Sequence, residues 1–232
     1  MTESEYEEAQ YKAELAAKEL QARMDSDRER FATLRGKAIA EFATLEHMLC
    51  ALFSDFGNLQ PTVATTIFFK IQNLHAIRNI MRELIEQKYG DRFAKFWGSL
   101  NSAVQRMSEM RNRIVHHSIM TASFPDGRMA TAIFKPQDLY KQSGYEEALQ
   151  DRNRTLNEVE LGAFIQECHF VRRLCLFFYG YLTQDADLVV GPEELRGRVS
   201  PAIWDDIFAR EISYPPDSTH PLFPLYKARE MA

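Results

Sequence analysis

The segment EMRNRIVHHSIM, residues 109–120, gathers the side chains of this sequence that are best suited to chemistry. Arg111 and Asn112 are followed by His116 and His117 within about two helical turns. Arginine offers phosphate oxygens a planar, permanently charged fork, and histidine exchanges protons near neutral pH. These groups suit metal-free cleavage of a phosphodiester beside a 2′-hydroxyl. An imidazole would take the hydroxyl proton, and the arginine would stabilise charge on phosphorus.

The positions of these groups on a helical wheel refine this interpretation. A helix is expected over residues 92–117, and Arg111 falls inside its apolar arc. A charged side chain on an apolar face needs a partner, an interface or a ligand. Asn112 and His116 are four residues apart and share a face of their own. Because one imidazole is base or acid at a given moment, a second would come from a two-fold partner chain or from His117.

The run from Arg111 to His116 resembles the R-x(4–6)-H signature of the HEPN superfamily, with Asn112 as the polar residue that often follows the arginine. His117 fits the same signature with one more spacer. The resemblance covers residues 37–183 and implies a helical bundle that dimerises. It further implies a metal-independent endoribonuclease of toxin–antitoxin, defence or RNA-processing systems. In the family the motif arginine and histidine are catalytic, which implies Arg111 and His116 as catalytic here, with Asn112 in support.

Two other interpretations stay open. Some members of the superfamily have lost activity, so the alternative is a non-catalytic helical dimerisation or binding module. Arg111 and His116 would then form a structural ion pair, and the charged N-terminal arm and the C-terminal tail would hold a protein partner. A third interpretation is a toxin whose activity is regulated by an antitoxin, a partner that this chain does not reveal.

A basic stretch leads into the motif. Between residues 70 and 116 nine Lys or Arg residues stand against four Asp or Glu residues, an excess of five positive charges. Such a patch could guide RNA to one place. The expected RNA contacts are Arg78, Arg82, Arg106 and Arg113. The competing interpretation is a charged, solvated face of two helices.

Two further pairs of charged residues have more than one expected role. Glu41 or Glu46 could orient His116 or pair with Arg111, or could simply be a helix-surface carboxylate. Arg172 and Arg173 could contact phosphate, or could extend their charged ends from an otherwise buried helix to solvent.

The elements that must position these residues follow from apolar periodicity. Helices are expected over residues 37–56, 62–88, 92–117 and 157–183, with Thr62 and Asp91 as N-caps. Residues 3–35 predict a charged helical arm with a thin apolar spacing through Ala13, Ala17, Leu20 and Met24. Alternating residues around Pro125, Asp126 and Gly127 predict a β-hairpin at 119–134. The fold class is therefore all-α: a HEPN-like bundle with a β-hairpin insertion.

The expected domain organisation has three parts. Residues 1–35 form the helical arm, residues 36–183 form the bundle, and residues 184–232 form an extended, proline-containing tail with one short helix near 200–210. The arm and the tail are additions to a minimal bundle and need not fold alone.

Composition excludes several classes of protein. The 232 residues carry 28 Lys or Arg and 33 Asp or Glu, a net charge of −5 that argues against bulk nucleic-acid binding but allows a local site. Cys50, Cys168 and Cys175 have no CxxC spacing, so neither a disulfide framework nor a zinc site is expected, and no cofactor is. No signal peptide or apolar span is evident, which predicts a cytoplasmic protein away from membranes.

Overall fold

The computed structural model describes residues 3–71, 73–124, 129–135, 155–183 and 201–219. This part of the chain is mostly helical and carries one small antiparallel sheet, which confirms the expected fold class at that level. The chain divides into two compact units. Unit 1 comprises Met1–Ile39 and Asn112–Ala163, and unit 2 comprises Ala40–Arg111 and Phe164–Ala232.

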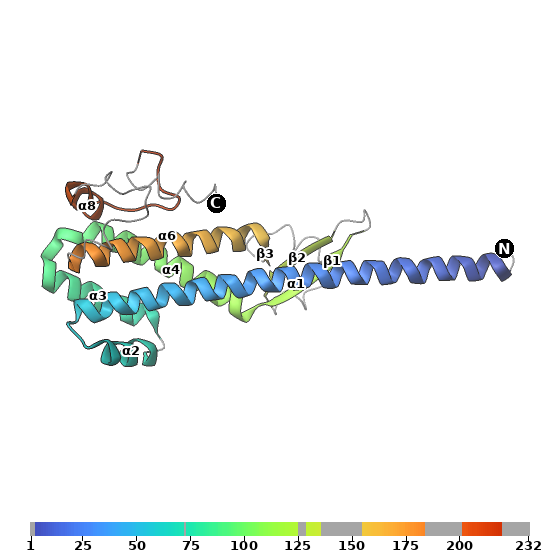
Figure 1. The fold of residues 1–232 in the computed structure, drawn as a ribbon, viewed down its shortest axis with the longest axis horizontal. Coiled ribbons are helices and arrows are strands. Elements are labelled where there is room, and N and C mark those ends of the chain that lie inside the picture. Colours follow the sequence, from blue (N-terminus) through green and yellow to red (C-terminus); the bar gives the residue numbers. More distant parts are fainter. Residues whose placement is uncertain (1–2, 72, 125–128, 136–154, 184–200, 220–232) are drawn as a thin grey trace. The chain divides into compact units, whose positions relative to one another are not determined.

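The first element is a single helix, α1, that spans Glu3–Phe56 (Figure 1). The expected arm and the helix expected over 37–56 are thus one continuous element, and Gly36 lies inside it. A glycine in a helix interior costs only about 1 kcal/mol, and the apolar pattern runs straight across it. We call this pattern the α1 row. Its members recur every seven residues: Met24, Phe31, Ala38, Leu45 and Leu52. Met24 is half-buried, and the other four are fully buried.

The sheet of unit 1 confirms the expected hairpin. Strand β1 (Ser118–Ser123) pairs antiparallel with β2 (Met129–Phe134), with Ser118 opposite Phe134. The hydroxyl groups of Thr121 and Thr131 lie 2.9 Å apart across the pair. A third strand, β3 (Thr155–Leu156), pairs with the other edge of β2 (Figure 1). The sequence does not indicate this strand, because two residues are too few to show an alternating pattern.

Arg35 of α1 caps the C-terminal end of helix α4 (Ala94–His116) within unit 1. Its Nε donates a hydrogen bond to the carbonyl of Ile114, and its Nη2 donates one to the carbonyl of Val115, both at 2.7 Å. The last carbonyls of a helix have no partner within the helix, and a positive charge there also opposes the helix dipole. One guanidinium therefore satisfies two orphan acceptors and fixes the last turn of α4.

The start of helix α6 (Glu158–Thr183) is fixed in two ways. Asn157 and Glu160 form a reciprocal capping box: the Asn157 side chain accepts from the Glu160 amide at 3.0 Å, and the Glu160 carboxylate accepts from the Asn157 amide at 2.8 Å. Arg30 of α1 also forms an ion pair with Glu158 at 2.9 Å. The helix expected over 157–183 begins within a residue of this boundary, although the capping box itself was not predicted.

Unit 2 departs from the expected helix over 62–88. Two helices occupy that range, α2 (Pro61–Lys70) and α3 (Leu74–Tyr89), and the Asn73 side chain caps α3 by accepting from the Ala76 amide at 3.3 Å. Gln60, not the expected Thr62, is the N-cap of α2, because Pro61 already occupies its first turn. Asp91 likewise does not cap α4: it lies inside a short 3₁₀ turn, η1 (Gly90–Phe93).

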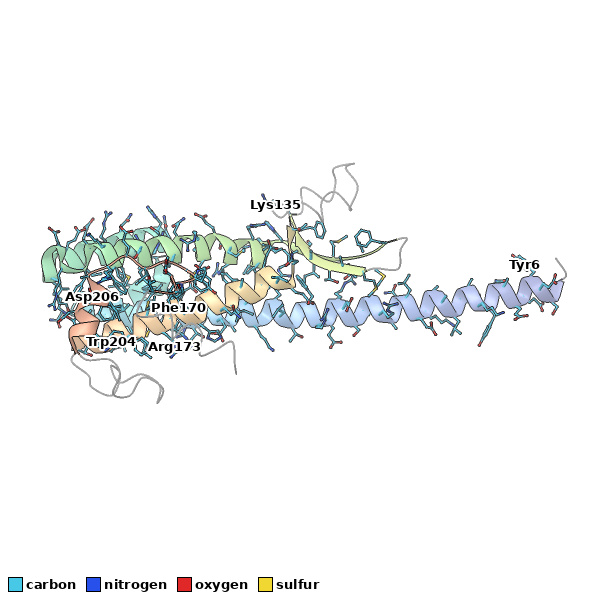
Figure 2. All side chains as sticks on the ribbon, turned by 90° about the horizontal axis from the view of Figure 1, so that it is seen from above. Tyr6, Lys135, Phe170, Arg173, Trp204 and Asp206 are labelled. Atoms are coloured by element: carbon cyan, nitrogen blue, oxygen red, sulfur yellow. The ribbon has the colours of Figure 1, made fainter. Side chains whose placement is uncertain are left out.

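The core of unit 2 is aromatic, and the C-terminal segment contributes to it. Helix α8 (Pro201–Phe208) confirms the short helix expected near 200–210. Its Trp204, labelled in Figure 2, and its Phe208 are buried. The Phe208 ring lies 4.9 Å from Phe96 of α4 and 5.0 Å from Phe178 of α6. This part of the expected tail therefore packs into the core, while residues 184–200 and 220–232 lie outside the described part of the chain.

Substitution of Arg35 tests the cap on α4. Arg35→Ala removes two charged hydrogen bonds, so we expect the free energy of unfolding to fall by about 1–3 kcal/mol. Arg35→Lys keeps the positive charge but not the planar pair of donors, and should lower the free energy of unfolding by less. Urea unfolding followed by circular dichroism measures both. Lys37→Ala, exposed on the same helix, is the control; an equal loss in Lys37→Ala and Arg35→Ala would contradict a specific role for the cap.

Candidate functional site

The motif occupies the last turns of α4, which is a continuous helix through all of its residues up to His116. Asn112 and His116 are both exposed, whereas Arg111 is half-buried. At about 100° per residue, Asn112 and His116 lie about 40° apart around the helix, and Arg111 and His116 about 140° apart. The expected shared face of Asn112 and His116 is thus open to solvent, and Arg111 occupies a different flank.

Arg111 packs against α1 within unit 2. Its guanidinium carbon lies 5.8 Å from the centre of the Phe42 ring, which is a cation–π arrangement. Glu46 follows Phe42 by one helical turn. Burial raises the pKa of the Glu46 carboxyl, and the positive charges of Arg111 and His47 act against that rise. Of the three roles expected for Glu46, this arrangement favours interaction with Arg111. The arginine on the apolar arc is therefore accommodated by an aromatic face and a nearby carboxylate.

The other glutamate considered has a different partner. Glu41 Oε1 lies 3.2 Å from His169 Nε2, and His169 Nδ1 lies 3.2 Å from Arg172 Nη2. Glu41, His169 and Arg172 therefore form a chain of polar contacts between α1 and α6. No sequence signal predicts this chain, because Glu41 is more than a hundred residues away from His169 and Arg172.

His116 is the last residue of α4, and the turn that carries it is the one that Arg35 caps. His117 follows immediately, is half-buried, and its amide donates to the carbonyl of Arg113 at 3.1 Å. Sequence reasoning did not single out Arg35. Periodicity could not reveal it, because its acceptors lie 79 and 80 residues away in the chain.

The four arginines expected to contact RNA have different surroundings. Arg78 is only 3% exposed. It donates to the carbonyls of Leu74 at 3.3 Å and Asn101 at 2.7 Å, and also to the Gln105 side chain. Its guanidinium thus joins α3 to α4 and is not presented to solvent, where the expected RNA contact would have to form. A tertiary contact of this kind leaves no mark in the sequence pattern.

The other three arginines are more accessible. Arg106 is exposed and forms an ion pair with Glu167 of α6 at 3.0 Å. Arg82 is exposed and lies 3.9 Å from Glu86, one turn further along α3. Arg113 is half-buried. Arg82 and Arg106 are therefore the two whose side chains are open to solvent.

The described part of the chain was examined for reactive cysteines, metal-ligand clusters and membrane spans. Cys50, Cys168 and Cys175 are free and buried, and burial raises the pKa of the Cys175 thiol to about 12, far from the range of a reactive thiolate. Within the described ranges, no three His, Cys, Asp or Glu side chains cluster as metal ligands would. In that same part of the chain no helix is both long and apolar enough to cross a membrane.

Comparisons with protein-family models, with curated proteins and with solved structures find no match to this chain. Function must therefore be inferred from the site itself.

The environment of Glu46 leads to a pH-dependent prediction. Burial raises its pKa in the folded chain above 4.5, so its ionisation disfavours folding. Relative to Glu46→Gln, the wild type should therefore lose stability as pH rises through the folded pKa, with a constant difference above it. Chemical unfolding of both proteins from about pH 4 to about pH 8 measures this difference. Glu83→Gln, exposed on α3, is the control. A wild-type advantage that grows with pH would contradict the prediction and show that attraction to Arg111 outweighs burial.

Proposed function

We propose that this protein is a metal-independent endoribonuclease of HEPN type. The observation that carries the proposal is the exposed face of the last turns of α4, where Asn112 and His116 lie one turn apart beside the flank that carries Arg111. An exposed imidazole and amide at a helix end that also carries a permanent cation supply the kinds of group that can cleave RNA through its own 2′-hydroxyl.

The proposed reaction is an internal transfer. His116 takes the proton of the 2′-hydroxyl, and the 2′-oxygen attacks phosphorus. The bond from phosphorus to the 5′-oxygen then breaks, leaving a 2′,3′-cyclic phosphate. The 5′-oxygen receives a proton from a second imidazole. Arg111 stabilises the charge that develops on the phosphoryl oxygens, and Asn112 orients either His116 or the substrate.

The angular separation of Arg111 and His116 supports a site completed by a second copy of the chain. Two groups about 140° apart on one helix face different directions. If two α4 ends pair about a two-fold axis, the His116 of one chain can approach the Arg111 of the other, and a second imidazole becomes available. His117 is the alternative source of that imidazole. A cytoplasmic homodimer acting in a toxin–antitoxin or defence system, with an antitoxin as partner, fits this scheme.

RNA cleavage in the presence of EDTA tests the function. Arg111→Ala and His116→Ala should each lower the cleavage rate by about 10²–10⁴, the usual contribution of one acid–base or charge-stabilising group. Arg111→Lys should recover part of that loss, because it keeps the charge without the fork. His117→Ala tests the alternative source of the second proton.

The matched controls are His75→Ala and Arg210→Ala, which remove the same side-chain types at positions of unit 2 outside the motif. Thermal melts should establish that every variant is folded. Cleavage that is equal in wild type, Arg111→Ala and His116→Ala, or that disappears on chelation, would exclude this function.

A second candidate is a non-catalytic dimerisation or binding module, and the N-terminal part of α1 favours it. The α1 row continues upstream of Met24 through Ala17, and a neighbouring series carries Leu20, Ala13 and Tyr6 at the same seven-residue spacing. These four residues are exposed, with Tyr6, labelled in Figure 2, at 57%. An exposed row in register with a buried one is typical of a helix that pairs with another helix.

Paired substitutions in α1 test this candidate. Ala17→Glu puts a charge on the exposed row, whereas Ala22→Glu puts the same charge on the opposite face. If the row pairs two chains, sedimentation velocity should show a dimer for wild type and Ala22→Glu and a monomer for Ala17→Glu. A dimer for Ala17→Glu and a monomer for Ala22→Glu would contradict pairing through the α1 row. That result would point instead to the face that carries Tyr11 and Leu15.

A further inference from the structure

The guanidinium of Arg35 has two edges that can donate hydrogen bonds, and the end of α4 uses only one of them. On that edge Nε donates to the carbonyl of Ile114 and Nη2 to the carbonyl of Val115, each at 2.7 Å. A guanidinium carries five N–H donors, so three of them remain, two on Nη1 and one on Nη2. Within the described part of the chain Arg35 has no other hydrogen bond and no ion pair. Nη1 is not among the fully buried nitrogens that lack a partner, so this second edge is open to solvent.

The open edge of Arg35 lies at the same helix end as the candidate base. His116 follows Val115 directly, and both belong to unit 1 together with Arg35. Because a carbonyl oxygen lies about 2.8 Å from the next Cα in a trans peptide, Arg35 Nη2 lies within about 6 Å of the His116 Cα. His116 is itself exposed. A ligand that reaches the imidazole therefore also comes close to the guanidinium.

The two hydrogen bonds to α4 fix the orientation of the Arg35 guanidinium. An arginine that moves freely loses side-chain entropy when it binds a phosphate. Arg35 has already lost part of that entropy on folding, because its anchored edge sets the plane of the fork. The open edge is thus preorganised for oxygen ligands in the same plane.

Arg35 also reverses the sign of the charge at this helix end. The aligned peptide dipoles give a helix C-terminus about −0.5 of an elementary charge, which repels a phosphate. The guanidinium places a full positive charge on the last carbonyls of α4 and exceeds that partial charge. A phosphate that approaches His116 is therefore attracted, whereas the bare helix end would repel it.

The sequence places no carboxylate within one helical turn of Arg35. The residues three and four positions away on α1 are Phe31, Ala32, Ala38 and Ile39. Along α4 and β1 the chain has no Asp or Glu between Glu109 and Asp126. Two carboxylates of unit 1, Asp27 and Glu158, pair with Arg30 at 3.6 and 2.9 Å. The charge of Arg35 is thus not cancelled by an ion pair in the described residues.

We propose that Arg35 is a substrate-binding residue, whose open edge binds an RNA phosphate beside His116 while its other edge caps α4. The proposed reaction needs positive charge near the phosphate, and Arg35 supplies it within the unit that carries the candidate base. The inference names a substrate contact of the proposed ribonuclease, and in that respect rests on the proposed function. Binding of the phosphate requires no cleavage, so the two can be tested separately.

The test is the salt dependence of binding to an RNA oligonucleotide with 2′-O-methyl groups throughout, which cannot be cleaved through its own hydroxyls. Fluorescence anisotropy with the full-length protein in EDTA measures the affinity at several salt concentrations. Arg35→Gln removes the charge and should weaken binding about fivefold. It should also lower the slope of log affinity against log salt by about 0.7, the contribution of one phosphate contact on a single strand. Arg35→Lys keeps the charge but cannot span both carbonyls, and should keep most of the wild-type slope.

Lys37→Gln is the matched control, because it removes one positive charge from an exposed position of the same helix. It should bind as wild type does, and thermal melts should establish that every variant is folded. An Arg35 that only caps α4 would lower the melting temperature of both Arg35 variants and leave their salt slopes at the wild-type value. That result would overturn the proposal, as would an equal loss of slope in Lys37→Gln or no RNA binding by the wild type.

The Nε–H signal of Arg35 in NMR spectra of the wild type gives a second readout that needs no destabilised variant. Its absence in Arg35→Lys assigns it. The signal should shift when the 2′-O-methyl oligonucleotide is added, because a phosphate on the open edge changes the electron distribution of the whole guanidinium. An unchanged signal at saturating oligonucleotide would overturn the proposal.

Cleavage of unmodified RNA by the same proteins separates this inference from the proposed function. In Arg35→Gln, kcat/KM should fall by at least the factor by which binding weakens. Wild-type kcat/KM and salt slope in folded Arg35→Gln would remove Arg35 from the site and retain the ribonuclease. The expected change of slope without any cleavage by the wild type would exclude the ribonuclease and retain the phosphate contact.

Discussion

Two hydrogen bonds from the Arg35 guanidinium to the carbonyls of Ile114 and Val115 hold the end of α4, and much of unit 1 depends on them. The last carbonyls of a helix must find partners or water, and an unsatisfied end frays. His116 lies on that last turn, and β1 starts only two residues later. The same contact therefore sets the direction in which the chain enters the sheet and the position from which the candidate base projects.

Arginine serves three distinct physical roles in this molecule. Arg35 is a helix cap, Arg78 is an interior connector that donates to backbone carbonyls, and Arg111 rests on an aromatic ring near a carboxylate. Each role satisfies the same requirement, since a guanidinium away from water must have its donors or its charge matched. Of the three, only Arg111 belongs to the helix end that carries the exposed Asn112 and His116, and it lies on a different flank of that helix. This position, rather than residue type, makes Arg111 a candidate site residue.

The parts of this fold that the sequence predicts are those governed by local rules. Apolar periodicity located α4 and α6, and turn chemistry located the hairpin of β1 and β2. The predicted helix boundaries were wrong where two local rules compete. Gly36 suggested a helix boundary, but the seven-residue apolar spacing across it prevails, and the break at Asn73 was hidden because apolar residues continue on both sides.

The same distinction between local rules and long-range contacts applies to the candidate site. The exposed face of Asn112 and His116 and the unusual position of Arg111 follow from helix geometry, so a wheel was sufficient to find them. Arg35, the contact chain of Glu41 and His169, and the interior role of Arg78 depend on contacts between residues far apart in the chain. No periodicity encodes such contacts.

Helix α1 has a further physical consequence. It is one hydrogen-bonded element, yet its N-terminal turns are exposed all round, while its later turns bury Phe31, Ala38, Leu45 and Leu52. Tertiary packing supplies most of the stability of a helix in water, so the free energy of opening a backbone hydrogen bond must rise along α1 from its tip to its buried end. A single secondary-structure element thus contains a gradient of local stability. Its tip can open and close many times while its buried end keeps the core intact.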